Sequence, residues 1–172
     1  MRSHTDIIDF RYHAARKAAS RLAGSMEWQV PGFGPETRIM TTLGAIPAGL
    51  LRRGDEVITP SGLSCGIEWL DRVGLDADFL ASHPNAHPRV IPAGSLGAGL
   101  PERDLVVSAG QQMMPGKTTR ATPGLPLPPE AVCKVHGFQY TLFHCGRPVQ
   151  VLAEGVWCPV DELSSLRGRR SA

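Results

Sequence analysis

Short hydrophobic segments alternate with turn residues along most of this chain. Runs rich in β-branched and aromatic residues are typical of β-strands, and they predict strands at Thr37–Thr42, Glu56–Thr59, Gly66–Val73, Arg89–Ile91, Leu105–Val107, Ala131–Val135, Phe138–Phe143 and Val149–Ala153. Turn signals separate them at Arg53-Gly54-Asp55, Pro60-Ser61-Gly62, Pro92-Ala93-Gly94, Pro115-Gly116 and Cys145-Gly146-Arg147. Short strands at this spacing indicate an all-β sandwich or barrel-like fold rather than alternating strands and helices.

Helical periodicity is confined to the N-terminal part of the chain, at residues 6–23. Ile7, Phe10 and Ala14 begin a series of apolar residues at three- and four-residue spacing, and the basic residues fall largely on other faces. Gly24 follows where a helix commonly ends. The pattern predicts one N-terminal α-helix whose basic face is solvated rather than bound to nucleic acid.

The chain is therefore expected to have three parts. Residues 1–31 form an N-terminal helical extension, residues 32–162 form the β domain, and residues 163–172 form a basic flexible tail. Residues 116–129 are rich in proline, threonine and glycine, so we expect a loop there without regular structure.

Composition narrows the class of protein. The chain has 172 residues, of which 42% are hydrophobic and 20% charged, enough for one domain with a core. The net charge of +2 is too small to indicate a nucleic-acid or membrane-surface partner. The chain contains neither an apolar signal region nor a stretch of roughly 18 apolar residues, so a cytoplasmic location is expected. Cys65, Cys133, Cys145 and Cys158 are far apart in sequence, and we expect reduced, mostly buried thiols.

Five blocks of sequence follow one another in a recognisable order. They are Phe33–Ile39 (FGPETRI), Leu51–Thr59 (LRRGDEVIT), Ile67–Leu70 (IEWL), Pro88–Ser108 (PRVIPAGSLGAGLPERDLVVS) and Val151–Gly155 (VLAEG). The fourth block is the most specific of them. Together they resemble the Hint domain of hedgehog proteins and inteins, in its bacterial form. The resemblance implies a Hint-like fold of short β-strands across most of the chain.

Hint domains cut their own backbone, and the resemblance shows what that chemistry would use here. A Cys or Ser side chain attacks the carbonyl of the preceding residue, and a His in a Thr/Ser-x-x-His block transfers the proton. The alignment implied by the resemblance puts Gly32 at the nucleophile position, and Ser108 and Gln111 at the first and last positions of the His block. Glycine offers no nucleophile, and glutamine cannot act as a general acid or base.

Further family residues are replaced near the last block. The resemblance implies that Leu142 and Pro148 stand where the family has histidines, and that Gly146 stands where it has an aspartate. Loss of a nucleophile with its acid/base partner typically lowers a rate about a thousandfold or more. We therefore predict a pseudo-enzyme with no catalytic residue, cofactor or metal. It would be kept as a binding or structural unit, with an unidentified protein partner or none.

One alternative is that the domain still cleaves itself slowly near Gly32, with a non-standard nucleophile. Cys65 is the candidate, because a thiol within reach of His83 or His87 would suffice for such chemistry. Against this, a single Cys before a strand is more often a small buried apolar residue, and loop histidines are more often solvated.

A second alternative is a binding module stabilised by zinc. Cys133 and His136 have ligand spacing, and His144 or Cys145 together with Cys158 could complete a tetrahedral site. Only one of His144 and Cys145 could face the metal, because neighbouring strand residues point to opposite faces. The same residues would also fit an ordinary core face without metal.

Overall fold

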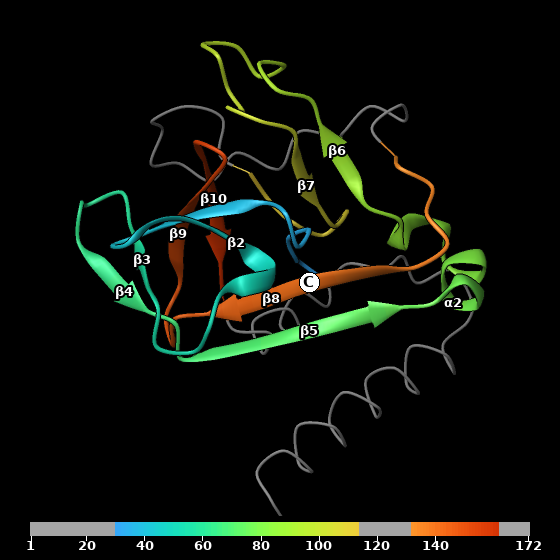
Figure 1. Ribbon diagram of the computed structural model, residues 1–172, viewed down its shortest axis with the longest axis horizontal. Coiled ribbons are helices and arrows are strands. Elements are labelled where there is room, and N and C mark those ends of the chain that lie inside the picture. The colour runs from blue at the N-terminus through green and yellow to red at the C-terminus, as the bar shows by residue number, and fades with distance from the viewer. Residues whose placement is uncertain (1–29, 114–131, 162–172) are drawn as a thin grey trace, which may run out of the picture.

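The computed structural model describes residues 30–113 and 132–161, which are mostly β-strand with little helix (Figure 1). The strands are β1 (Arg38–Thr41), β2 (Gly44–Pro47), β3 (Glu56–Ile58), β4 (Ser64–Gly66), β5 (Trp69–Leu75), β6 (Arg89–Ile91), β7 (Leu105–Val107), β8 (Phe138–His144), β9 (Val149–Ala153) and β10 (Val156–Val160). The helical elements are α2 (Ala77–Ser82) and the 3-10 turns η1 (Ala48–Leu50) and η2 (Pro84–Ala86). The all-β class expected from the sequence is confirmed. In these two ranges no helix has the length and apolar character needed to span a bilayer.

The strands form three antiparallel sheets. Six strands make the largest sheet, in the order β10-β9-β1-β3-β4 with β2 paired to β1. The long strands β5 and β8 pair along their whole length, and β6 pairs with β7. In Figure 1 the β5–β8 ribbon runs along one side of the molecule, with α2 at one end and β3 and β4 near the other.

Most of the predicted strands are present. The runs that became β6, β7 and β9 were predicted with their observed bounds. The predicted strand Ala131–Val135 is wrong over its described part, where Val132 makes only an isolated bridge to Arg89. The sequence interpretation missed β2, β4, β10 and α2. The expected helix at residues 6–23, the loop at residues 116–129 and the tail lie outside the described residues.

Two apolar clusters form the interior, and β8 contributes to both. The larger cluster lies among the sheets and contains Phe33, Phe143 and Cys145. The smaller one lies near α2 and contains Tyr140 and Leu142. Successive strand residues point to opposite faces, so a strand that separates two cores must be apolar on both sides. This explains why four successive residues of β8, Tyr140 to Phe143, are all buried.

The segment around Phe33 lies between β7 and β8 and joins their two sheets. Phe33 forms isolated bridges to Val107 and to Thr141. Its backbone N–H donates to the Thr141 oxygen at 3.0 Å, and the Thr141 N–H donates back to the Phe33 oxygen at 2.8 Å. One residue further on, the Gly34 N–H donates to Val106 at 2.8 Å. The chain around Phe33 is thus fixed on both sides.

A buried carboxylate joins β1 to the β9–β10 hairpin. Glu154 is 3% exposed and accepts hydrogen bonds from the backbone and the guanidinium of Arg38, the closest at 2.8 and 2.9 Å. The hydrogen bond to Glu154 raises the pKa of Arg38, so the guanidinium stays charged. Glu154 and Gly155 both have positive φ, 46° and 82°, the conformation of a two-residue hairpin turn. This turn produces β10.

Candidate functional site

Gly32 lies buried in the segment between β7 and β8. Its carbonyl oxygen accepts a hydrogen bond from the backbone N–H of Ser108 at 2.9 Å. The residue after it, Phe33, is bonded to Thr141 through both of its backbone groups. A nucleophile at position 32 would attack the peptide bond between Pro31 and Gly32. This bond lies next to backbone that is hydrogen-bonded to Ser108, just after β7, and to Thr141 of β8.

There is little room for a side chain at position 32. A Cβ atom built on Gly32 would lie 3.0 Å from the Cβ of Tyr140 and 3.4 Å from Cδ1 of Leu142. Tyr140 cannot easily move away, because it is 1% exposed and its hydroxyl donates to the Ala86 carbonyl at 2.8 Å. Burial raises the pKa of Tyr140, so the hydroxyl stays protonated and keeps this bond. Packing against β8 thus fits glycine and disfavours a larger residue.

Ser108 holds the backbone around Pro31 in place. Its side chain is 1% exposed, and its hydroxyl donates to the Val30 carbonyl at 2.7 Å. Together with the bond between its N–H and the Gly32 oxygen, this contact holds the chain on both sides of Pro31. The hydroxyl is therefore engaged with backbone rather than free for chemistry.

Gln111 is also engaged with backbone. Its side-chain amide donates to the carbonyl of Pro159 at 2.9 Å and to that of Gln112 at 3.1 Å. Both amide hydrogens are thereby used, and the side chain is 7% exposed. An amide held in this way fixes residue 111 to β10 and transfers no proton.

A cavity of about 20 Å³ lies beside these residues. Its ten described lining residues are Pro31, Gly32, Phe33, Trp69, Gln111, Thr141, Leu142, Phe143, Val160 and Asp161. Asp161 is the ionisable one among the ten, and it is exposed. The Thr141 hydroxyl is completely buried and has no hydrogen-bond partner in the described parts of the chain. The volume is close to that of one water molecule.

The structure brings together only some of the residues that the resemblance singled out. Gly32, Gln111 and Leu142 line the same cavity, and Ser108 bonds to the backbone on either side of Pro31. Gly146 instead lines a separate open depression, with φ of 71° and the Glu68 carboxylate packed against it. Apart from Asp161, no acid/base side chain of the described residues lines the cavity.

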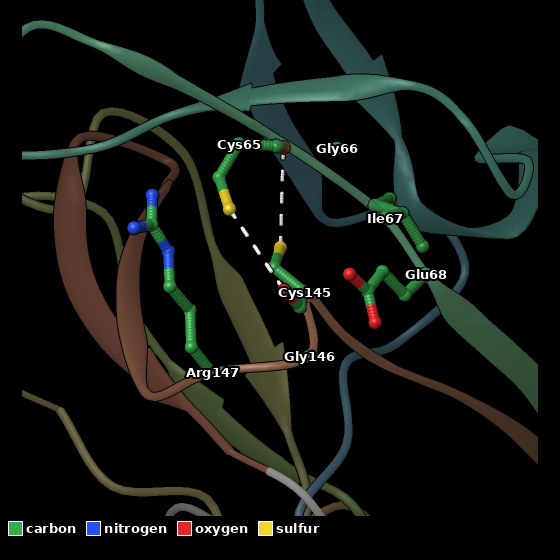
Figure 2. A pocket seen from close by; sticks show the side chains of 7 residues that line it. All are labelled: Cys65, Gly66, Ile67, Glu68, Cys145, Gly146 and Arg147. Atoms are coloured by element: carbon green, nitrogen blue, oxygen red, sulfur yellow. Dashed lines mark hydrogen bonds between the residues drawn. The ribbon is translucent and has the colours of Figure 1, made fainter.

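Cys65, the alternative nucleophile, lies in the depression with Gly146 (Figure 2). Neither His83 nor His87 lines it. The Nδ1 of His83 is 3.1 Å from the Phe79 oxygen, and that of His87 accepts the Val135 N–H at 3.3 Å. The structure thus brings Cys65 together with neither Gly32 nor the two loop histidines.

The candidate zinc ligands are dispersed. Cys133 is exposed, whereas Cys145 and Cys158 are buried, and burial raises the pKa of each of these two thiols to about 12. The His144 ring stacks on Trp69, with 5.4 Å between ring centroids. Over residues 30–113 and 132–161, no three His, Cys, Asp or Glu side chains are grouped so that they could hold a metal ion.

Sequence reasoning missed two residues of this site, Tyr140, which packs against Gly32, and Thr141, which lines the cavity. Both belong to the predicted strand Phe138–Phe143, but that pattern does not reveal which segment packs on each face of the strand. The alternation along the strand could only have indicated that Tyr140 and Leu142 share one face.

Comparison with known protein families gives a match. Residues 31–124, more than half of the chain, match the Hint domain family. Among solved structures, the crystal structure of the gp41-1 intein aligns with 75% of this chain and 98% of its own length, at 11% sequence identity and a TM-score of 0.44. No curated protein sequence matches the chain significantly.

Proposed function

The chain belongs to the Hint domain family, and we propose that it is a member that does not process its own backbone and serves as a folded binding or structural module. The observation that carries this proposal is the packing of Gly32 against β8. The position that the family alignment assigns to the nucleophile has no side chain, and Tyr140 and Leu142 occupy the space next to it.

Self-cleavage requires an electron pair close to the preceding carbonyl and a proton for the departing amide nitrogen. Gly32 supplies no electron pair. Gln111 stands where the family has its histidine, and its amide hydrogens are already donated to Pro159 and Gln112. The site therefore lacks both the nucleophile and the proton donor. This supports a rate of self-cleavage that is negligible.

The proposal is tested by trapping an activated backbone in the unmodified full-length chain. Hydroxylamine and dithiothreitol both cleave a thioester, and hydroxylamine also cleaves an oxygen ester, so either intermediate near Gly32 would yield two fragments. We expect the intact mass to be the same with and without either reagent. Accumulation of fragments 1–31 and 32–172 would refute the proposal.

One observation favours a second candidate function, slow self-cleavage by an unusual nucleophile. The Thr141 hydroxyl is buried, has no partner in the described parts of the chain, and lines the same cavity as Gly32. If fragments form in the experiment above, Thr141→Val tests this candidate, since the variant keeps the shape and removes the hydroxyl. Cleavage that persists in Thr141→Val would exclude Thr141 as the nucleophile.

A further inference from the structure

Two cysteines far apart in the sequence lie against each other in the depression that contains Gly146. Cys65 belongs to β4, and Cys145 directly follows β8. The Cys65 thiol lies 4.0 Å from the backbone oxygen of Cys145, and the Cys145 thiol lies 3.9 Å from the backbone oxygen of Cys65. Figure 2 shows both sulfur atoms turned into the space between the two segments. The contact is reciprocal, so each sulfur faces the other residue.

The backbone next to the pair is already fixed. The Glu68 N–H donates to the His144 oxygen at 3.0 Å, and Trp69 opposite His144 starts the β5–β8 ladder. On the other side, β4 is held to β3, with Cys65 paired to Val57. A bond between two sulfurs is unstrained only when the two backbones are close and held at a suitable distance. The neighbouring ladders hold the two backbones beside each other.

The pair is accessible to small reagents. The depression has a volume of about 400 Å³ and is open to solvent on one side. Cys65 is 9% exposed and Cys145 is 4% exposed. The exposed residues Glu68 and Arg147 stand at its rim (Figure 2). A small polar oxidant can therefore reach sulfurs that a protein thiol cannot reach.

We propose that Cys65 and Cys145 are a reversible disulfide site, oxidised by a small peroxide, that links the six-stranded sheet to the β5–β8 sheet. In the first step a Cys65 S–O bond forms as the peroxide O–O bond breaks, which gives a sulfenic acid and, with hydrogen peroxide, releases one water. Sulfur of Cys145 then attacks Cys65, the S–S bond forms, the S–O bond breaks, and a second water leaves. Each sulfur loses one electron and the peroxide gains two. A small dithiol reverses the reaction.

Electrostatics predict that this oxidation is slow at neutral pH. Burial, and next the neighbouring Cys65 thiol, raise the pKa of Cys145 to about 12, with a smaller raising effect from Glu68 and an opposing effect from Arg147. Since the thiolate is the reactive form, oxidation should accelerate as the pH rises. The site is thus suited to respond to sustained oxidising conditions rather than to brief ones.

The experiment uses the full-length chain with Cys133→Ser, which removes the exposed thiol that could link two chains. After incubation with hydrogen peroxide at mildly alkaline pH, we expect two free thiols per chain to be lost. We also expect one cross-linked peptide pair that joins Cys65 to Cys145, and recovery of both thiols with dithiothreitol. Cys158 should stay reduced, because it is fully buried and its thiol contacts the Val156 oxygen.

Two results would overturn the proposal. One is that the thiols of the Cys133→Ser chain persist through prolonged incubation with excess hydrogen peroxide at mildly alkaline pH. The other is that Cys65 and Cys145 are oxidised singly to sulfenic or sulfinic acids without a cross-linked peptide. The mapping needs no substitution at the pair itself, so it does not depend on whether Cys65→Ser or Cys145→Ser folds.

Discussion

At the scale of single residues, Gly32 is held by backbone hydrogen bonding and packed closely by its neighbours. Its carbonyl is bonded to Ser108, and a Cβ built on it would lie only 3.0 Å from the Cβ of Tyr140. A cysteine restored at this position would have to displace a tyrosine that is anchored to Ala86. Reversal of the substitution alone is therefore not expected to rebuild a working nucleophile.

Gly32→Ala tests this packing directly. We expect it to lower the free energy of unfolding by about 1–3 kcal/mol, the usual range for overpacking in a rigid core. Gly74→Ala is the matched control, because a Cβ there meets nothing within 4 Å, and it should be neutral or stabilise by up to about 1 kcal/mol. Urea unfolding measures both. Equal effects at the two glycines would show that position 32 is not crowded.

Thr141 allows a second test at the same site. Its buried hydroxyl has no partner among residues 30–113 and 132–161, and an unsatisfied buried polar group costs about 1–3 kcal/mol. Thr141→Val keeps the shape and removes that cost, so we expect the chain to become more stable in urea. Thr141→Ser, which keeps the hydroxyl and loses a methyl group, should instead be destabilised. A loss of stability in Thr141→Val would mean that the hydroxyl is satisfied, for example by a buried water.

At the scale of elements, the β9–β10 hairpin depends on the buried carboxylate of Glu154. Glu154→Gln retains the shape but replaces charge-assisted hydrogen bonds to Arg38 with neutral ones, so we expect a loss of about 1–3 kcal/mol in urea unfolding. Glu102→Gln is the control. Glu102 also faces Arg38, at 3.9 Å, but is 62% exposed, and such pairs contribute less than about 1 kcal/mol. Similar losses in the two variants would contradict the importance of burial.

Strands could be predicted where a short stretch of sequence contains the whole signal. Strands such as β6 and β9 are apolar runs bounded by turn residues, and the sequence located them with the observed bounds. The hairpin that makes β10 was missed because its turn places Glu154, a non-glycine residue, at positive φ, and the contact with Arg38 that holds it there is not local. The helix α2 is short and depends on a cap in which Asp76 accepts the Phe79 N–H.

The candidate site was predictable only in part, for a related reason. The family resemblance singled out Gly32 and Gln111 as residues of the site, and in the structure both line one cavity. The partners that fix them, Tyr140 and Pro159, come from strands far along the chain, and composition carries no information on such contacts. The same holds for Cys65 and Cys145, which are 80 residues apart.

At the scale of the whole molecule, buried thiols lower the stability of the fold as the pH rises into the alkaline range. Burial raises the pKa of Cys145 and of Cys158 from an ordinary value near 9 to about 12. Above pH 9 the unfolded chain releases these protons while the folded chain keeps them, so stability falls as pH rises towards 12. The loss for each thiol is at most about 1.4 kcal/mol per pH unit.

This dependence is measured by urea unfolding under reducing conditions from about pH 8 to about pH 11. Burial raises the pKa of Tyr140 as well, which acts in the same direction. Cys158→Ala should reduce the slope, because it removes one of the groups responsible. A flat profile in the unmodified chain would show that these side chains are not buried as described.

The chain has a Hint-type fold, and the proposal is that it does not process its own backbone. The most direct test is the mass of the full-length chain, followed from its synthesis in a cell-free system through days of incubation without added reagent. The account predicts one species of 172 residues throughout. The appearance of a 141-residue fragment that begins at Gly32, obtained as 172 minus 31 residues, would contradict it.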